Sequence, residues 1–411
     1  MAHGRFTRRQ ERRAAVTARR GKGAATHRMP EITLTTFPDF GALAGEWRDL
    51  EERAEAFSFF QSWTWTGCLV EERFTAPLLV RATTEGRTVG LALLNRCRGS
   101  LHLGQSGDHE RDSIYIEHNG PLVAADAPPG LAGRMLAGCW GEGRARRLVL
   151  PGVPPALAAG AGGLPLRAQR LPAPFVDLVA ITAGAADFVA SRSRNTRAQL
   201  RRSLRHFSEA GPLALLRPDS DAQALAWLGE MITLHGEAWG RRGRPGAFAG
   251  GFVRRFHAAL VPAARARGEL DLLRIQAGGE LLGFLYNFRH HGTVYAYQSG
   301  FRPFPDAQDA RPGLVGHALA IEEARQAGLA RYDFLAGDAR YKRSLATGEA
   351  ELAWVELVRH DLRGRIEAGA RRAVVALRAR LRAGSGGTGR GFHVEPRGGD
   401  SVQARNLHER D

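Results

Sequence analysis

The hydrophobic pattern is clearest in the second half of the chain. Apolar residues recur at helical spacing in four segments, over 191–211, 220–239, 250–268 and 312–328. Short apolar runs typical of strands occupy six segments, over 212–218, 269–277, 280–290, 293–301, 331–337 and 351–360. Ser220 or Asp221 would cap the second helix, and Pro312 and Gly328 bound the fourth. The pattern predicts a first helix and strand, two helices, three antiparallel strands, a helix, a strand, a connection and a last strand.

The first half of the chain mixes strands and helices. Strands are predicted over 31–37, 76–86, 87–97, 146–153 and 173–181, the second and third as a hairpin. Helices are predicted over 46–54 and 131–143. Residues 154–166 are rich in Gly, Ala and Pro and are expected to form a loop. We therefore expect one domain over 30–184 and a second over 185–360.

The positive charge of the chain is concentrated near its ends. The 411 residues carry a formal net charge of +16. Residues 1–29 contribute +8 and residues 361–411 contribute +5, so the part between is nearly balanced. A basic tail can attract nucleic acid or anionic lipid. We expect 1–29 to be a disordered tail or a mis-annotated start, because Met29-Pro30 leads directly into a strand, and 361–411 to be a basic helix and a disordered tail.

The remaining composition narrows the class of protein. No apolar run is long enough to span a membrane, and no apolar segment follows the charged N-terminus. The three cysteines are far apart, which favours reduced thiols and a cytoplasmic location. His102, His109 and His118 lack the close spacing of metal ligands, so no metal is expected.

A set of residues in the second half carries a family resemblance. These residues are Arg197, Leu200, Arg201, Arg202, Trp239, 297–300 (Tyr-Gln-Ser-Gly), Pro312, Gly313, 333–335 (Asp-Phe-Leu), Gly337, Tyr341 and Lys342. Residues 59–72 in the first half match as well. With them the chain resembles the CelD-like GNAT N-acetyltransferases, which are related to the FemAB transferases. The resemblance implies an α/β (α+β) fold of tandem GNAT-like domains, each a mixed, mostly antiparallel sheet flanked by helices.

The same resemblance implies an acetyl-CoA or other acyl-CoA donor, and as acceptor an amine of a sugar or cell-envelope/polysaccharide precursor. Most GNAT enzymes bind the donor pyrophosphate through (Q/R)-x-x-G-x-(G/A) at the start of the central helix. If Gly313 is the first glycine here, Ala310 and Val315 occupy the outer motif positions. A helix N-terminus still offers backbone N–H groups to a phosphate. The donor-binding candidates are Gln298, Ser299, Arg311, Gly313, Arg197 and Arg201, although the last two would also suit a solvated helix face.

Four residues are candidates for catalysis. Lys342 is one of only two lysines in the chain, and a compact ammonium could contact an anionic group where a guanidinium would not fit. Asp333, on an apolar strand, would act as a base or form a structural ion pair with Arg331, Arg340 or Lys342. Tyr341 would bind a leaving thiolate or anchor its loop. Glu237 is a further candidate general base.

Candidate substrate contacts come from both halves of the chain. Trp239 is expected to be a pocket wall, and Tyr297 ends the third strand of the meander. Residues 104–120 are unusually polar for a segment between strands. Its Asp112, Glu117 and Asn119 would face a cleft shared with the second domain, or belong to a solvated loop.

The leading interpretation is a GNAT N-acyltransferase with its site between two domains. A FemAB-like transfer from aminoacyl-tRNA is one alternative, since basic tails would suit tRNA, and a catalytically silent scaffold in envelope biosynthesis is another. A helix is predicted over 365–384, whose Ile366, Val374, Val375, Leu377 and Leu381 lie among arginines. We expect this helix to pack on the body of the protein, with weak association with a membrane surface as the alternative.

Overall fold

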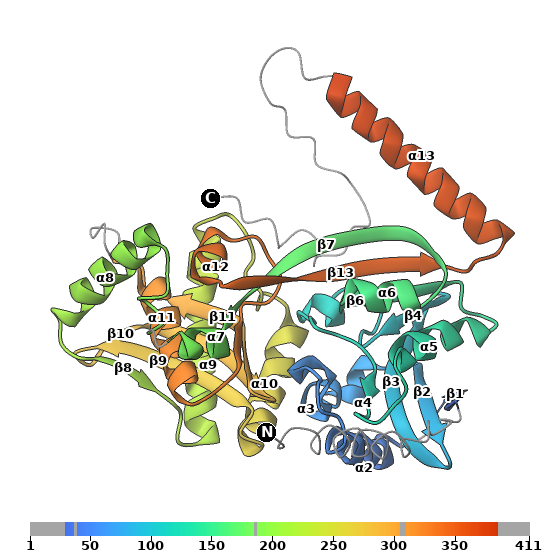
Figure 1. The fold of residues 1–411 in the computed structure, drawn as a ribbon, viewed down its shortest axis with the longest axis horizontal. Coiled ribbons are helices and arrows are strands. Elements are labelled where there is room, and N and C mark those ends of the chain that lie inside the picture. Colours follow the sequence, from blue (N-terminus) through green and yellow to red (C-terminus); the bar gives the residue numbers. More distant parts are fainter. Residues whose placement is uncertain (1–28, 37–38, 185–186, 305–309, 385–411) are drawn as a thin grey trace, which may run out of the picture.

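The computed structural model describes residues 29–36, 39–184, 187–304 and 310–384, without the side chains of 379 and 381–384. The predicted N-terminal tail, apart from Met29, and the predicted C-terminal tail beyond residue 384 lie outside this part of the chain. Within it, the predicted α/β class is confirmed: one large mixed sheet is flanked by helices (Figure 1).

The sheet has 13 strands, and twelve of them follow one path. In chain order the strands are β1 (Glu31–Thr35), β2 (Pro77–Thr84), β3 (Arg87–Cys97), β4 (Ser100–Leu103), β5 (Leu122–Val123), β6 (Arg147–Val153), β7 (Leu164–Asp177), β8 (Leu213–Leu216), β9 (Leu270–Ala277), β10 (Glu280–His290), β11 (Thr293–Phe301), β12 (Arg331–Asp333) and β13 (Gly348–Val358). Their spatial order is β1-β2-β3-β4-β6-β13-β7-β12-β11-β10-β9-β8, with β5 beside β3. The predicted meander is confirmed as β9-β10-β11, antiparallel throughout.

Helices lie on both faces of this sheet. They are α2 (Phe40–Glu51), α3 (Trp63–Thr66), α4 (Val70–Arg73), α5 (Leu131–Gly138), α6 (Pro155–Gly160), α7 (Leu178–Ala183), α8 (Arg194–Ser208), α9 (Asp221–Gly240), α10 (Gly251–Ala266), α11 (Pro312–Gln326), α12 (Arg340–Leu345) and α13 (Leu362–Gly384). Ser220 caps α9, because its side chain accepts a hydrogen bond from the Gln223 N–H. Pro312 occupies the first turn of α11, as predicted.

Two sequence predictions between 154 and 181 were wrong. Residues 154–166 are not only a loop, because α6 and the start of β7 lie there. The small residues that suggested a loop instead allow close helix packing: a side chain at Gly133 of α5 would come within 3.2 Å of the Gly160 backbone in α6. The predicted strand over 173–181 ends at Asp177, whose side chain caps α7 by accepting from the Ala180 N–H.

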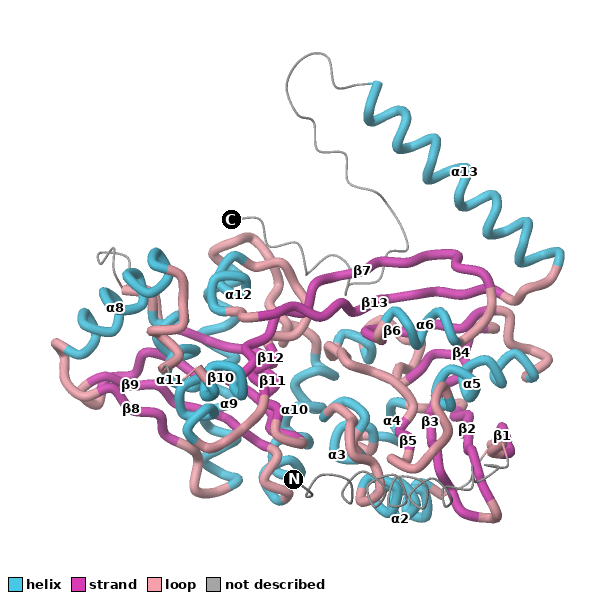
Figure 2. Tube along the Cα trace, viewed as in Figure 1, coloured by secondary structure: helices cyan, strands magenta, loops and turns pink. Residues whose placement is uncertain are grey.

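The two halves of the chain exchange strands. The last strand, β13, comes from the second predicted domain but lies between β6 and β7 of the first. In turn, β7 pairs with β12 through Asp177, Val176 and Phe175. Figure 2 shows β7 and β13 running side by side from one half of the molecule to the other. The domain limits at 184/185 and 360 therefore stay a prediction, and any cut at 184 would separate paired strands.

A shared aromatic core also joins the halves. Phe59, Phe60 and Trp65 of the first half are buried among α9, α10 and the meander strands. The Phe59 ring stacks on Phe288 of β10 with ring centroids 4.1 Å apart. Burial of such large rings is the main favourable term in packing one half against the other. The segment 59–72 therefore contributes to the core of the second half through Phe59, Phe60, Trp65 and Cys68, whereas its Trp63 and Val70 belong to the core of the first half.

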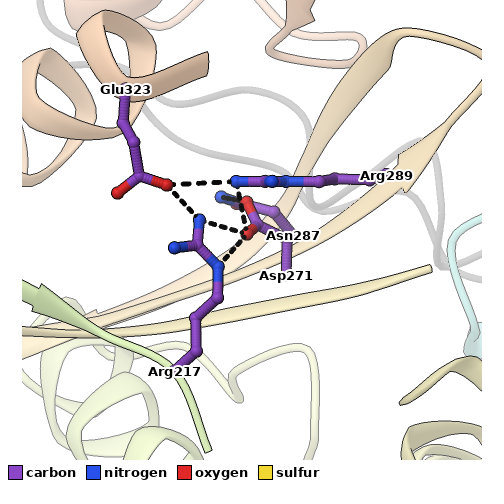
Figure 3. A network of polar contacts seen from close by, with 5 residues as sticks. All are labelled: Arg217, Asp271, Asn287, Arg289 and Glu323. Atoms are coloured by element: carbon purple, nitrogen blue, oxygen red, sulfur yellow. Dashed lines mark hydrogen bonds and ion pairs between the residues drawn. The ribbon is translucent and has the colours of Figure 1, made fainter. Parts of the chain in front are cut away.

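A polar network holds α11 to the sheet at the opposite end from its N-terminus. Asp271 of β9 accepts hydrogen bonds from Arg217, at 2.9 and 3.1 Å, and contacts Arg289 of β10 at 3.0 Å (Figure 3). Both arginines also contact Glu323 of α11, and Asn287 donates to the second Asp271 oxygen at 3.4 Å. The Asp271 side chain is almost fully buried, so these partners compensate for the loss of its hydration.

Candidate active site

A cavity of about 1070 Å³ opens where β11 extends beyond its neighbour. The parallel pairing of β11 with β12 ends at Tyr295 and Asp333, so the edge of β11 from Ala296 onward has no partner in β12. The cavity lies along this edge. Its walls come from α8, α9, the N-terminus of α11, the segment 334–344 and two residues of the first half, Tyr115 and Glu117.

The open end of β11 is fixed to α9. A Cβ atom on Gly300 would lie 2.4 Å from the Met231 carbonyl oxygen, so only glycine permits this close approach. The His235 Nε2 accepts a hydrogen bond from the Ala247 N–H, at 3.1 Å, and its Nδ1 then donates to the Ser299 carbonyl oxygen, at 2.9 Å. Burial lowers the pKa of His235, which favours this neutral form.

Five arginines and the N-terminus of a helix line the cavity. Arg311 precedes α11, and Gly313 and Leu314 in the first turn of that helix line the cavity. The other arginines in the lining are Arg202 of α8, Arg241 and Arg242 at the end of α9, and Arg340 of α12. The first backbone N–H groups of a helix have no partner within the helix, and they attract anions. The cavity is therefore suited to a polyanionic ligand.

The Ala336 backbone is held by residues from both halves of the chain. The Glu117 carboxylate accepts a hydrogen bond from the Ala336 N–H, and Lys342 Nζ donates to the Ala336 carbonyl oxygen at 2.8 Å. All three residues line the cavity. Burial raises the pKa of Glu117 to about 7, although the Lys342 ammonium and the Ala336 N–H act in the opposite direction. A carboxyl that titrates near neutral pH can accept a proton from a reacting group.

Asp333 lies behind the cavity lining and contacts the backbone of the lining residue Leu335. It is fully buried, and its Oδ1 accepts a hydrogen bond from the Leu335 N–H at 2.8 Å, which stabilises the left-handed backbone of Leu335 (φ 61°). Its Oδ2 lies 3.3 Å from His118 Nε2 and 4.0 Å from an Arg331 nitrogen. Among the ion-pair partners considered for Asp333, Arg331 lies within this range. Burial alone would lower the pKa of His118, but the Asp333 carboxylate outweighs burial and raises it.

Tyr341 is held against a buried histidine. Its ring stacks on His317 of α11, with centroids 5.4 Å apart and an angle of 18° between the planes. His317 Nδ1 lies 2.9 Å from the Tyr332 hydroxyl oxygen, and burial lowers the pKa of this histidine to about 3, so it is neutral. The stack fixes Tyr341 at the cavity wall, next to Lys342.

Nine of the predicted site residues line the cavity, and six do not. Those that line the cavity are Glu117, Trp239, Tyr297, Gln298, Ser299, Arg311, Gly313, Tyr341 and Lys342. Those outside its lining are Asp112, Asn119, Arg197, Arg201, Glu237 and Asp333. The roles assigned to all fifteen residues stay predictions.

The residues outside the lining have visible structural contacts or solvent exposure. Asp112 accepts hydrogen bonds from the Ser106 and Gly107 N–H groups within its own loop. Asn119 donates to the Leu103 and Pro151 carbonyl oxygens. Arg197 donates to the Ala190 carbonyl oxygen, and Arg201 and Glu237 are exposed on their helices.

Three histidines at or beside the site were not predicted: His118, His235 and His317. From the sequence, His118 was considered only as a metal ligand. Its left-handed backbone (φ 48°) and its 3.3 Å contact with Asp333 appear only in the structure. His317 lies on α11 next to a glycine, and no pattern in the sequence distinguishes it from an ordinary core residue.

Residues 194–343 match the sequence model of a family described as "Acetyltransferase (GNAT) domain". No curated protein sequence matches the chain.

Among solved structures, FemX is similar at 11% identity with a TM-score of 0.51, over 79% of this chain and 97% of FemX. L-PGS from Bacillus licheniformis is similar at 11% identity with a TM-score of 0.49, over 82% and 96% of the two chains. A tandem GNAT protein from the clavulanic acid biosynthesis pathway is similar at 13% identity with a TM-score of 0.40, over 79% and 97%. The predicted resemblance is confirmed at the level of the GNAT superfamily: residues 194–343 match the GNAT domain model, and the fold of the chain is similar to that of FemX.

Proposed function

We propose that this chain is an N-acyltransferase that transfers an acetyl or larger acyl group from acyl-CoA to an amine. The observation that carries the proposal is the open edge of β11 beside the N-terminus of α11, in one cavity. The edge offers backbone N–H and carbonyl groups that can form hydrogen bonds with the extended arm of acyl-CoA. The resemblance to CelD-like enzymes favours an amine of a sugar or cell-envelope/polysaccharide precursor as the acceptor.

The charge of the cavity supports a phosphorylated donor. Arg202, Arg241, Arg242, Arg311 and Arg340 all line the cavity, and Arg311 directly precedes α11. The diphosphate of acyl-CoA would lie against the N-terminal N–H groups of α11, although Ala310 and Val315 replace the usual motif residues. Trp239 and Tyr297 would provide apolar surface for the acceptor.

The reaction follows from the positions of the remaining residues. The amine nitrogen attacks the thioester carbonyl carbon, and a backbone N–H at Gln298 or Ser299 holds the oxyanion that forms. Glu117 accepts the proton that the amine loses, since its carboxylate lines the same cavity. The carbon–sulfur bond then breaks, and Tyr341 donates a hydrogen bond to the leaving thiolate. Lys342 and Asp333 keep the segment around Ala336 in place for these steps.

Calorimetric titration of the full chain with acetyl-CoA, longer acyl-CoAs and S-acetylpantetheine tests the donor. We expect acyl-CoA to bind and to raise the melting temperature, and S-acetylpantetheine to bind at least tenfold more weakly, because it lacks the phosphates. Arg311→Glu should weaken acetyl-CoA binding, whereas Arg302→Glu should not. Arg302 is exposed nearby but lies outside the cavity lining.

Turnover is measured as CoA thiol release in the presence of amino sugars and other amines. If no acyl-CoA binds and charged tRNA binds instead, the donor is an aminoacyl-tRNA and the proposal is wrong. If neither binds, the catalytically silent scaffold is the better interpretation.

A further inference from the structure

The C-terminal helix α13 touches the body of the protein with one side only. The Gly364 N–H donates to Asp361 Oδ1 at 2.8 Å at the start of the helix, and Gly364 and Ala368 are buried. Glu367 forms an ion pair with Arg147 of β6. Beyond this contact α13 leaves the sheet and projects outward (Figure 1).

The opposite side of α13 is apolar and exposed. Its residues recur every three or four positions: Leu362, Ile366, Ala370, Ala373 and Leu377, which we name the α13 stripe. At about 100° per residue, the stripe points away from Ala368 by about half a turn. The exposed fractions of Leu362, Ile366 and Leu377 are 75%, 65% and 58%. The expectation that this helix packs on the body through Ile366, Val374, Val375 and Leu377 was therefore wrong, because all four are exposed. The side chain of Leu381 lies outside the described part of the chain.

The remaining surface of α13 is strongly basic. The helix contains seven arginines, at 363, 365, 371, 372, 378, 380 and 382, and a single acidic residue, Glu367. That glutamate is already paired with Arg147. The helix therefore presents an apolar stripe between basic side chains, and neither feature is neutralised by a contact among the described residues.

We propose that α13 lies on an anionic lipid surface, with its stripe among the acyl chains and its arginines at the head groups. No helix in the described part of the chain is long and apolar enough to cross a bilayer, so the contact is with the surface. Lipid satisfies both features of the helix: apolar burial for the stripe and negative charge for the arginines.

Two other possible binding partners match the surface of α13 less well. A second copy of α13 would bring two arginine-rich helices together, and Ala370 and Ala373 at the centre of the stripe would bury little area. A nucleic acid would use the arginines but would leave Ile366 and Leu377 in water. Both occupants are distinguishable in the experiment below.

Co-sedimentation of the full chain with phosphatidylcholine vesicles, with and without phosphatidylglycerol, tests the proposal. We expect binding that requires phosphatidylglycerol and weakens as salt increases. Ile366→Gln should bind about tenfold or more weakly than the wild-type chain, since it removes a buried apolar side chain without changing charge. Arg372→Gln with Arg378→Gln should weaken binding as well.

Val375→Gln is the matched control. Val375 is 53% exposed on the same helix, but it lies on the side that carries Ala368. It should bind vesicles like the wild-type chain. Equal binding of the Ile366 and Val375 variants, or no preference for anionic vesicles, would overturn the proposal. A dimer in sedimentation that only Ile366→Gln dissociates would assign the stripe to a second copy, and RNA binding unaffected by Ile366→Gln, without vesicle binding, would assign the helix to nucleic acid.

Discussion

Glu117 and Lys342 hold the two polar backbone atoms of one residue, Ala336. The carboxylate accepts from its N–H, and the ammonium donates to its carbonyl oxygen at 2.8 Å. Glu117 comes from a polar loop of the first half and Lys342 from α12, 225 positions later in the sequence. The cavity wall at Ala336 is thus fixed by both halves, and both charges face the same ligand space.

Replacing Glu117 and Glu237 in turn should show which of the two glutamates acts as the general base. Glu117→Gln should lower turnover by about 10²- to 10⁴-fold, because the amide cannot accept a proton in the reaction. The amide oxygen can still accept from the Ala336 N–H, so the melting temperature should change little. Glu237→Gln, on the exposed side of α9, should change turnover less than about twofold. The reverse result would make Glu237 the base.

Turnover should depend on the charge of Glu117. Because the pKa of Glu117 is about 7, activity should rise as the pH increases through about 7. Lys342 lowers this pKa, so Lys342→Met should move the midpoint of the pH–rate profile upward as well as reduce the rate.

Lys342→Arg keeps the charge, so its midpoint should stay near that of the wild-type chain, while turnover falls because a planar guanidinium cannot replace the compact ammonium at Ala336. A pH–rate profile with the same midpoint in Lys342→Met would show that the two charges do not interact. Full turnover in Lys342→Arg would show that any cation suffices at this position.

The ion pair between His118 and Asp333 should make stability depend on pH. The folded-state pKa of His118 is raised above its unfolded value of about 6.5. The contribution of the pair is therefore fully present below about pH 6.5, and it is lost as the pH rises through the folded-state pKa. Urea unfolding of the wild-type chain and of His118→Gln should differ most near pH 6 and least near pH 9.

Glu117 also has a raised pKa and lies next to His118. Its titration therefore lowers the free energy of unfolding as the pH rises, in the same direction as the titration of His118. Both measurements should therefore be repeated in a Glu117→Gln background, where only the His118 effect remains. If the chains with and without His118→Gln differ in stability by the same amount at all pH values, the prediction is wrong.

The network around Asp271 should contribute to stability without affecting turnover. Asp271→Asn removes the charge that two arginines share, and we expect a loss of about 2 kcal/mol in the free energy of unfolding. Glu323→Gln, at the more exposed end of the same network, should cost less than about 1 kcal/mol. Urea unfolding gives both values, and turnover per folded molecule should stay unchanged because Asp271 does not line the cavity. Equal losses of unfolding free energy in the two variants would mean that the burial of Asp271 does not determine how much it contributes to stability.

The sequence predicted the second half of the fold well because its elements carry strong local signals. The periodic apolar pattern, the Ser220 cap and Pro312 in the first turn of α11 act within a few residues, and the structure follows them. The structure of segment 154–181 was harder to predict, since the same small residues suit both a loop and a closely packed helix. Here only packing against α5 decided the outcome.

The sequence by itself also predicted which backbone would line the candidate site: β11 and the start of α11, identified by their order and by residues 297–300 and 312–313. What only the tertiary structure decided was which side chains join them. No local signal links β13 to β6, or Glu117 to Ala336, because strand pairing and side-chain contacts between distant segments depend on how the whole chain packs. For the same reason the sequence left Asp333 as either a base or a member of an ion pair, and only the structure shows its contacts with His118 and the Leu335 N–H.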